Sequence, residues 1–152
     1  MDTLAHLKHL YGFNDWANRI IVRQARSTGS ARVLAYLAHV LITEKEYYER
    51  LFGKDSTGFN FWPEAGVDDC ASLAKENNER FLKLLEGFDD EGLGQRVSYK
   101  TSQGVEFENS FREILTHVLF HSMNHRGQIL TILREEGFEP PAIDYIVYER
   151  TR

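Results

Sequence analysis

The chain has 152 residues, of which 42% are hydrophobic and 27% charged, a composition typical of one globular domain that buries its own core. Its formal net charge is -5, and its lysines and arginines are scattered, so we expect no nucleic-acid partner. No stretch has the roughly eighteen uncharged apolar residues of a membrane-spanning helix, and the N-terminus has no apolar signal segment. We therefore expect no membrane partner and a cytoplasmic location.

Two long helices are predicted in the first third of the chain. Apolar residues at helical intervals predict one helix over residues 3–26 and a second over about 31–52. Asn14 and Asn18 share the apolar side of the first helix, where they either hold a histidine ring, line a pocket or hydrogen bond to another helix. His39 lies on the second helix, which is apolar on more than one side, so the pattern does not predict its direction.

The middle of the chain is less regular. Residues 53–66 are rich in glycine and aromatic residues and are too hydrophobic for a free linker, so we expect this loop to pack over something. A third helix, with a mixed polar sequence typical of an exposed helix, is predicted from residues 68–69 to about Leu85. Cys70 near its start is either a thiol with a lowered pKa or an incidental free thiol. Alternating apolar and polar residues at 96–101 and 104–108 predict a β-hairpin.

The last long helix has clear start and stop signals. A capping box, Ser110-x-x-Glu113, begins it, and Gly137 followed by two prolines ends it. The apolar tail at 142–148 is expected to dock as a short strand or turn. Together these elements predict a single all-α domain over residues 1–152, a four-helix bundle with a small β-hairpin inserted before the last long helix.

That last helix carries His117, His121 and His125 at four-residue intervals. On a helix this spacing places the rings on one face, where two successive imidazoles can reach one ion. Projected on a helical wheel, His125 lies about 40° from the middle of the apolar stripe, His121 about 80° and His117 about 120°. We therefore expect His121 and His125 to face the core and to be the two histidines that could bind one ion.

Two interpretations of this pair remain open. Burying two imidazoles without partners would cost a few kcal/mol, so either a metal ion or ordinary hydrogen bonds at the edge of the core must satisfy them. Two histidines of one helix with a third from another would leave a coordination position open, which is the pattern of a catalytic site, and Zn(II), Ni(II) and Fe(II) all accept imidazole. The chain has no Glu-x-x-His, His-Glu-x-x-His, Gly-x-Ser-x-Gly or phosphate-loop motif, so di-iron, hydrolase and nucleotide-binding interpretations lack support.

Four segments carry a resemblance to a known family. The segments Tyr11-Gly-Phe-Asn-Asp-Trp-Ala-Asn18, His39-Val-Leu-Ile-Thr-Glu44 and His117-x3-His121-x3-His125-Arg-Gly-Gln128, with the tail Pro140-Pro-x2-Asp-Tyr145, resemble the DinB/YfiT-like metalloenzyme family nearly end to end. The resemblance implies a four-helix bundle, often a homodimer. It implies that His39, His121 and His125 bind a divalent transition metal and that His117 is not a usual ligand. Asn14, Asn18 and Gln128 are candidates for the pocket or for holding a ligand.

The resemblance also bears on activity. Characterised members include thiol-dependent S-transferases and isomerases that use bacillithiol or mycothiol. We therefore expect a metal-dependent enzyme that acts on a small-molecule substrate, an electrophile, with a low-molecular-weight thiol. The alternative is a non-catalytic metal-binding or interaction protein with the same bundle, because fold and site transfer between relatives better than reaction.

Overall fold

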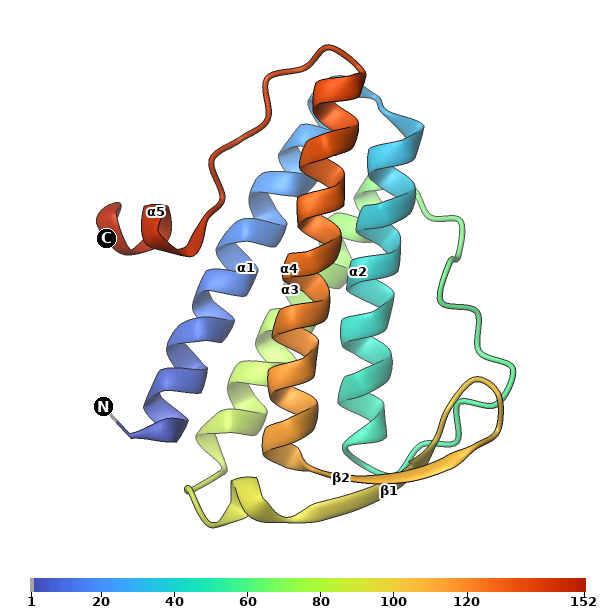
Figure 1. Cartoon of the computed structure of the whole chain (residues 1–152), viewed down its shortest axis with the longest axis vertical. Helices are drawn as coiled ribbons and strands as arrows, with labels where there is room; N and C mark the ends of the chain where they lie inside the picture. Colours follow the sequence, from blue (N-terminus) through green and yellow to red (C-terminus); the bar gives the residue numbers. More distant parts are fainter. Residues whose placement is uncertain (1) are drawn as a thin grey trace.

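The computed structural model describes residues 2–152 and consists mainly of long helices with a two-stranded sheet at one end (Figure 1). The elements in chain order are α1 (Thr3–Thr28), α2 (Ala31–Arg50), α3 (Val67–Glu86), a short 3-10 turn (Gly92–Gly94), β1 (Arg96–Lys100), β2 (Glu106–Ser110), α4 (Phe111–Glu135) and α5 (Tyr145–Arg150). The predicted fold class is confirmed: an all-α bundle with a β-hairpin directly before the last long helix.

Local chemistry accounts for the ends of the helices. The Asp2 side chain accepts a hydrogen bond from the Ala5 N–H at the start of α1, and Gly29 ends that helix at φ 63°, a left-handed conformation that favours glycine. At the start of α4, Ser110 and Glu113 form the predicted capping box, each side chain accepting from the other's backbone N–H. These signals are local, which is why the sequence located the helix ends closely.

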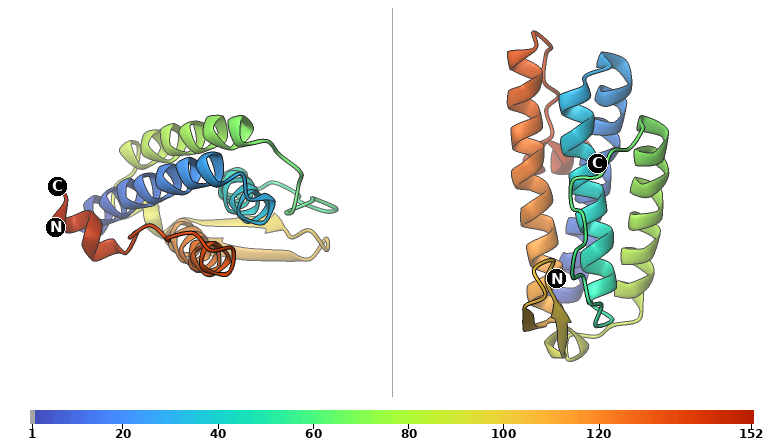
Figure 2. Two further views of the ribbon diagram at one scale, coloured as in Figure 1. Left: turned by 90° about the horizontal axis from the view of Figure 1, so that it is seen from above. Right: turned by 90° about the vertical axis from the view of Figure 1, so that its right-hand side faces the viewer.

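The helices do not simply alternate in direction. Helices α1 and α4 run one way along the bundle, and α2 and α3 run the other way (Figures 1 and 2). Because α2 and α3 are parallel, residues 51–66 must return along the length of the bundle, and they do so beside α2. The hairpin anchors this loop, since the Ser56 N–H donates to the Lys100 carbonyl (3.0 Å) and the Gly58 N–H to the Ser102 carbonyl (2.9 Å).

Two expectations, one about the exposure of α3 and one about the conformation of the tail, were wrong. Helix α3 is not an exposed helix but buries a full stripe, which the sequence concealed because its members are partly small or polar: Cys70, Ala74, Asn77, Phe81 and Leu85. The tail is neither a strand nor a turn, because Tyr145–Arg150 forms the helix α5. Contacts with α1 hold it there: His9 pairs with Glu149, and the Phe13 and Tyr145 rings meet edge to face at 5.3 Å.

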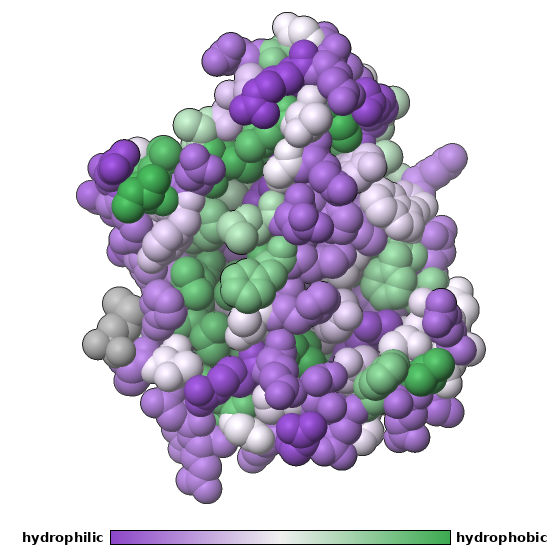
Figure 3. Space-filling view, in the orientation of Figure 1, coloured by the Kyte–Doolittle hydropathy of each residue, from purple (hydrophilic) through white to green (hydrophobic). Residues whose placement is uncertain are grey.

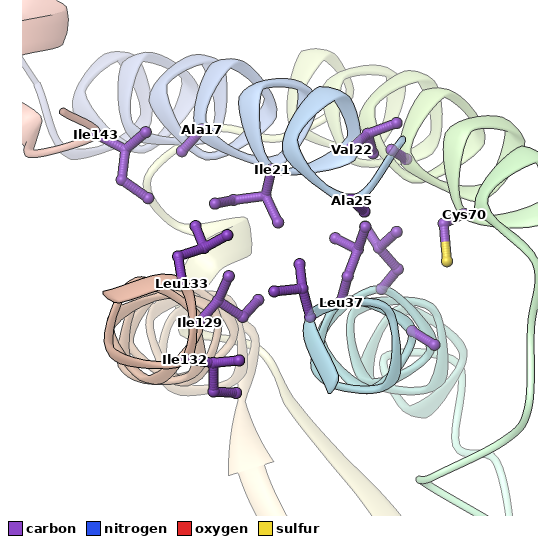
Figure 4. Packing of buried hydrophobic residues seen from close by; sticks show 14 of the residues in the cluster. Ala17, Ile21, Val22, Ala25, Leu37, Cys70, Ile129, Ile132, Leu133 and Ile143 are labelled. Atoms are coloured by element: carbon purple, nitrogen blue, oxygen red, sulfur yellow. The ribbon is translucent and has the colours of Figure 1, made fainter. Parts of the chain in front are cut away.

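The buried apolar residues form two clusters rather than one. One cluster lies toward the C-terminal end of α1 and includes Ile21, Leu37 and Leu133 (Figure 4), and the other lies toward the hairpin and includes Leu7 and Leu115. A layer of buried polar side chains lies between them: Asn14, Asn18, Glu44, Asn77, Ser122 and Arg126. In the described part of the chain, no helix has the length and apolar character needed to cross a membrane.

Candidate metal centre

Three histidines meet where α2 packs against α4. His39 comes from α2, and His121 and His125 come from successive turns of α4, and one ring nitrogen of each lies within 4.8 Å of the others. The His125 ring centroid lies 4.5 Å from that of His39 and 4.5 Å from that of His121. The pair favoured by helical periodicity thus lies together with the histidine that only the family resemblance supplied. His117 is outside this cluster, with its ring centroid 5.8 Å from that of His121.

Hydrogen bonds fix the orientation of two of these rings. Nδ1 of His39 lies 2.6 Å from the Phe61 carbonyl oxygen, and Nδ1 of His125 lies 2.6 Å from Oε1 of Gln128. Both oxygens can only accept, so Nδ1 is the protonated nitrogen of each neutral ring, and each Nε2 presents a free lone pair. Gln128 is therefore a residue that holds a candidate ligand in place.

The two free lone pairs face each other. Nε2 of His39 and Nε2 of His125 are 3.2 Å apart, and neither carries the proton that a hydrogen bond between them would need. A tetrahedral ion with metal–nitrogen bonds of about 2.0–2.1 Å holds its ligand nitrogens about 3.3–3.4 Å apart, close to this spacing. Nδ1 of His121 is also fully enclosed and has no hydrogen-bond partner among residues 2–152. The donor set therefore fits a divalent transition metal ion.

Burial favours the neutral form of His39 and His121. It lowers the pKa of His121 to about 3, assisted by repulsion from His125, His39 and His117. Burial also lowers the pKa of His39, opposed by the hydrogen bond to Phe61 and assisted by His125. Metal binding requires neutral imidazole, so at neutral pH His39 and His121 do not need to lose a proton before they can act as ligands.

The loop that follows α2 covers one side of the cluster. The Trp62 ring stacks on the His39 ring with centroids 3.8 Å apart and an angle of 2° between the planes, and Tyr36 meets Trp62 edge to face at 5.2 Å. Together with the Phe61 carbonyl, Trp62 clamps His39 from the loop side. The predicted packing of this hydrophobic loop is confirmed, and what it packs over is the histidine cluster.

Asn14 and Asn18 lie elsewhere, in the polar layer, where they hydrogen bond between helices. Their Nδ2 atoms donate to the Glu44 carboxylate at 2.8 and 3.0 Å, and their Oδ1 atoms accept from Nη1 of Arg126 at 2.7 and 2.8 Å. Ser122 also donates to Glu44, at 2.7 Å, and Asn77 at 3.3 Å. Both asparagines also border a cavity of about 10 Å³, room for roughly one water molecule.

This polar layer connects the two helices that carry the histidines of the candidate metal centre. Glu44 lies on α2 and Ser122 and Arg126 on α4, so the layer joins the two helices that carry the histidines and also joins both to α1. Arg126 is 2% exposed, and burial lowers its pKa to about 10 although Glu44 opposes the shift. Sequence reasoning missed the buried charges of Glu44 and Arg126, and the two asparagines on the apolar face of α1, which bridge them, were the only signal.

Cys70 is buried in the apolar cluster and is 1% exposed. Burial raises the pKa of its thiol to about 11, and the neighbouring Asp69 carboxylate adds to the shift. The alternative of a thiol activated by the start of α3 was therefore wrong, because desolvation outweighs the effect of the helix end.

Comparison with known proteins agrees with the earlier resemblance. A sequence profile of the DinB family matches residues 4–152. "Protein DinB" of Bacillus subtilis (strain 168) is 24% identical over 156 residues, which cover 91% of each chain, and "Uncharacterized protein YizA" of the same organism is 22% identical over 134 residues, which cover 86% of this chain and 83% of YizA. No solved structure gives a significant match. Because the profile spans nearly all of the sequence, this chain belongs to the DinB family.

Proposed function

We propose that this protein is a metal-dependent enzyme that transfers a low-molecular-weight thiol to a small electrophile, with His39, His121 and His125 as its metal ligands. One observation carries the metal: the unprotonated Nε2 atoms of His39 and His125 face each other 3.2 Å apart beside an unsatisfied His121. Family membership and the absence of any fourth His, Cys, Asp or Glu ligand from the cluster in the described chain support an enzyme, because three protein ligands leave a position for substrate.

The protein's own groups would act by holding the ligands rigidly. The Phe61 carbonyl and Gln128 Oε1 keep the Nδ1 protons of His39 and His125 in place, so both Nε2 atoms stay available. Trp62 excludes water from one face of His39. When bound, a divalent ion would stabilise a thiolate or hydroxide as a nucleophile near neutral pH.

The test is thiol-dependent turnover by purified protein loaded with Zn(II), Ni(II) or Fe(II). We expect the protein to conjugate a fluorogenic alkyl halide with at least one of several low-molecular-weight thiols. The rate should fall to background after chelation or in the His125→Ala variant, and the His117→Ala variant should keep most of it. Stoichiometric metal binding without turnover across several thiols would refute the transferase and support the alternative, a non-catalytic metal-binding protein. Trp62 and the loop over His39 favour that alternative, because they restrict access.

We also propose that two copies of the chain associate. Apolar side chains gather on the face formed by α1 and α4 (Figure 3), where Phe120 is 63% and Met123 50% exposed. A cavity of about 240 Å³ with an almost wholly apolar lining lies in the same face. Exposed patches of this kind often mark protein interfaces. Light scattering should give twice the mass of the 17.6 kDa chain, and Phe120→Asp should halve it; a monomeric wild type would contradict the proposal.

A further inference from the structure

The last residue of α2, Arg50, is a buried cation that has no carboxylate beside it in the described part of the chain. Arg50 is 3% exposed, and its Nε donates to Oγ of Ser56 at 3.0 Å. Three aromatic rings surround its guanidinium, with centroids 4.6 Å (Tyr47), 5.3 Å (Phe61) and 5.3 Å (Tyr99) from Cζ. Among residues 2–152, no carboxylate oxygen lies within 4 Å of it.

The neighbouring acids are engaged elsewhere. Glu46, one turn before Arg50, and Glu49 both pair with Lys54 instead. The aromatic rings offset part of the cost of burying the cation, but a buried charge is normally paired with an opposite one. In the described chain neither terminal nitrogen of Arg50 has a hydrogen-bond partner, and neither is fully enclosed. The guanidinium thus keeps donors that can reach a ligand.

Two aromatic residues, Tyr47 and Phe61, connect Arg50 to the histidine cluster. The Tyr47 ring lies between Arg50 and His117, with its centroid 4.8 Å from that of His117, and His117 in turn neighbours His121. Phe61, which contacts Arg50 through its ring, holds His39 through its carbonyl. Arg50 and His39 both belong to α2, and the loop that carries Phe61 returns beside that helix (Figures 1 and 2). Tyr47 follows His39 by eight residues, about 12 Å along the helix.

We propose that Arg50 binds a carboxylate of the molecule that reaches the histidine cluster, so that the site selects an anionic thiol. The thiol would lie at the histidines, and the carboxylate would accept hydrogen bonds from the free terminal nitrogens of Arg50. A guanidinium suits this task because its planar donors match a carboxylate. This inference rests on the proposed function, to which it adds the chemical class of the thiol.

The test is a binding experiment on Co(II)-loaded full-length protein. Coordination of a thiolate produces a sulfur-to-cobalt absorption band, so the Kd can be measured without turnover. The probes are ω-mercaptocarboxylates from 3-mercaptopropionate to 11-mercaptoundecanoate, each compared with the mercaptoalcohol of the same length. We expect the acid to bind about ten- to a hundred-fold more tightly than the alcohol once the chain spans the gap, the usual effect of a charge-assisted hydrogen bond, and to show little preference at the shortest length.

Variants assign the preference to Arg50. Arg50→Met should abolish it with Co(II) binding unchanged, Arg50→Lys should keep part of it, and Arg32→Met, which removes an exposed arginine of the same helix, should keep all of it. Equal binding of acid and alcohol by Co(II)-loaded wild type would overturn this inference and leave the proposed function standing. Failure to bind Co(II), or to bind any thiol, would overturn both. The wild-type comparison decides the matter even if Arg50→Met fails to fold.

Discussion

The buried charges of Glu44 and Arg126, which two asparagines bridge, provide the sharpest prediction about stability. Glu44 is 2% exposed and accepts hydrogen bonds from four side chains, and Arg126 is joined to it through the two asparagines of α1. The change Glu44→Gln keeps the shape of the side chain, removes the negative charge and turns an NH2 group toward donors. It therefore leaves the Arg126 cation buried without a counterion.

Breaking a buried charge pair by removing one partner costs about 3–5 kcal/mol. For a chain of this size each kcal/mol lowers Tm by about 2–4 °C, so we expect Glu44→Gln to lower Tm by about 6–20 °C. Urea denaturation measured by circular dichroism gives the free energy of unfolding directly. The matched control is Glu76→Gln, which removes a half-exposed carboxylate 3.7 Å from Arg80 and should change stability by about 0.5 kcal/mol or less.

A double variant checks the physical reason. Adding Arg126→Met to Glu44→Gln removes the orphaned cation, so it should recover part of the lost stability. A loss of unfolding free energy below about 1 kcal/mol for Glu44→Gln would refute the reasoning. Such a loss is no larger than that of one ordinary hydrogen bond, so the buried charge of Glu44 would not stabilise the fold. A double variant less stable than either single variant would show that the hydrogen bonds, and not the charges, hold the layer together.

Three further predictions concern the site and the thiol. His121→Ala and His125→Ala should each weaken metal binding about 100-fold or more in a chelator competition, and His117→Ala only a few-fold; equal losses for His117 and His125 would refute the ligand assignment. Gln128→Leu should weaken binding about 10- to 100-fold because His125 loses its orienting acceptor, and unchanged affinity would contradict that role. Cys70, with its pKa raised to about 11, should react with a disulfide reagent at pH 8 about 100-fold more slowly in folded protein than in urea, where its pKa returns to about 8.5; equal rates would show an accessible thiol.

Those features of the fold that depend on local chemistry could be predicted from the sequence. The capping box at Ser110 and Glu113 and the glycine after α1 act within a few residues, so the helix ends were found to within two residues. The α5 helix was missed because it is only six residues long and is held by contacts such as His9 with Glu149, which are distant in sequence. The stripe on α3 was missed because a buried Asn77 looks like a surface residue.

The site divides in the same way. Helical periodicity predicted the inward direction of His121 and His125, because one side of α4 is clearly apolar. Periodicity could not predict the direction of His39, because α2 is surrounded by neighbours. Only the family resemblance identified His39 as a ligand. The asparagine-bridged link between Glu44 and Arg126 could not be predicted, since charged residues are normally exposed and nothing local indicates which buried partner they meet.

The central claim is that imidazoles from α2 and α4 share one divalent ion. Anomalous diffraction at the absorption edge of the metal, from crystals of metal-loaded protein, tests it most directly. The account predicts a single strong peak within coordination distance of His39, His121 and His125, and no such peak in crystals of His125→Ala. A peak elsewhere on the chain, or none between these three rings, would contradict it.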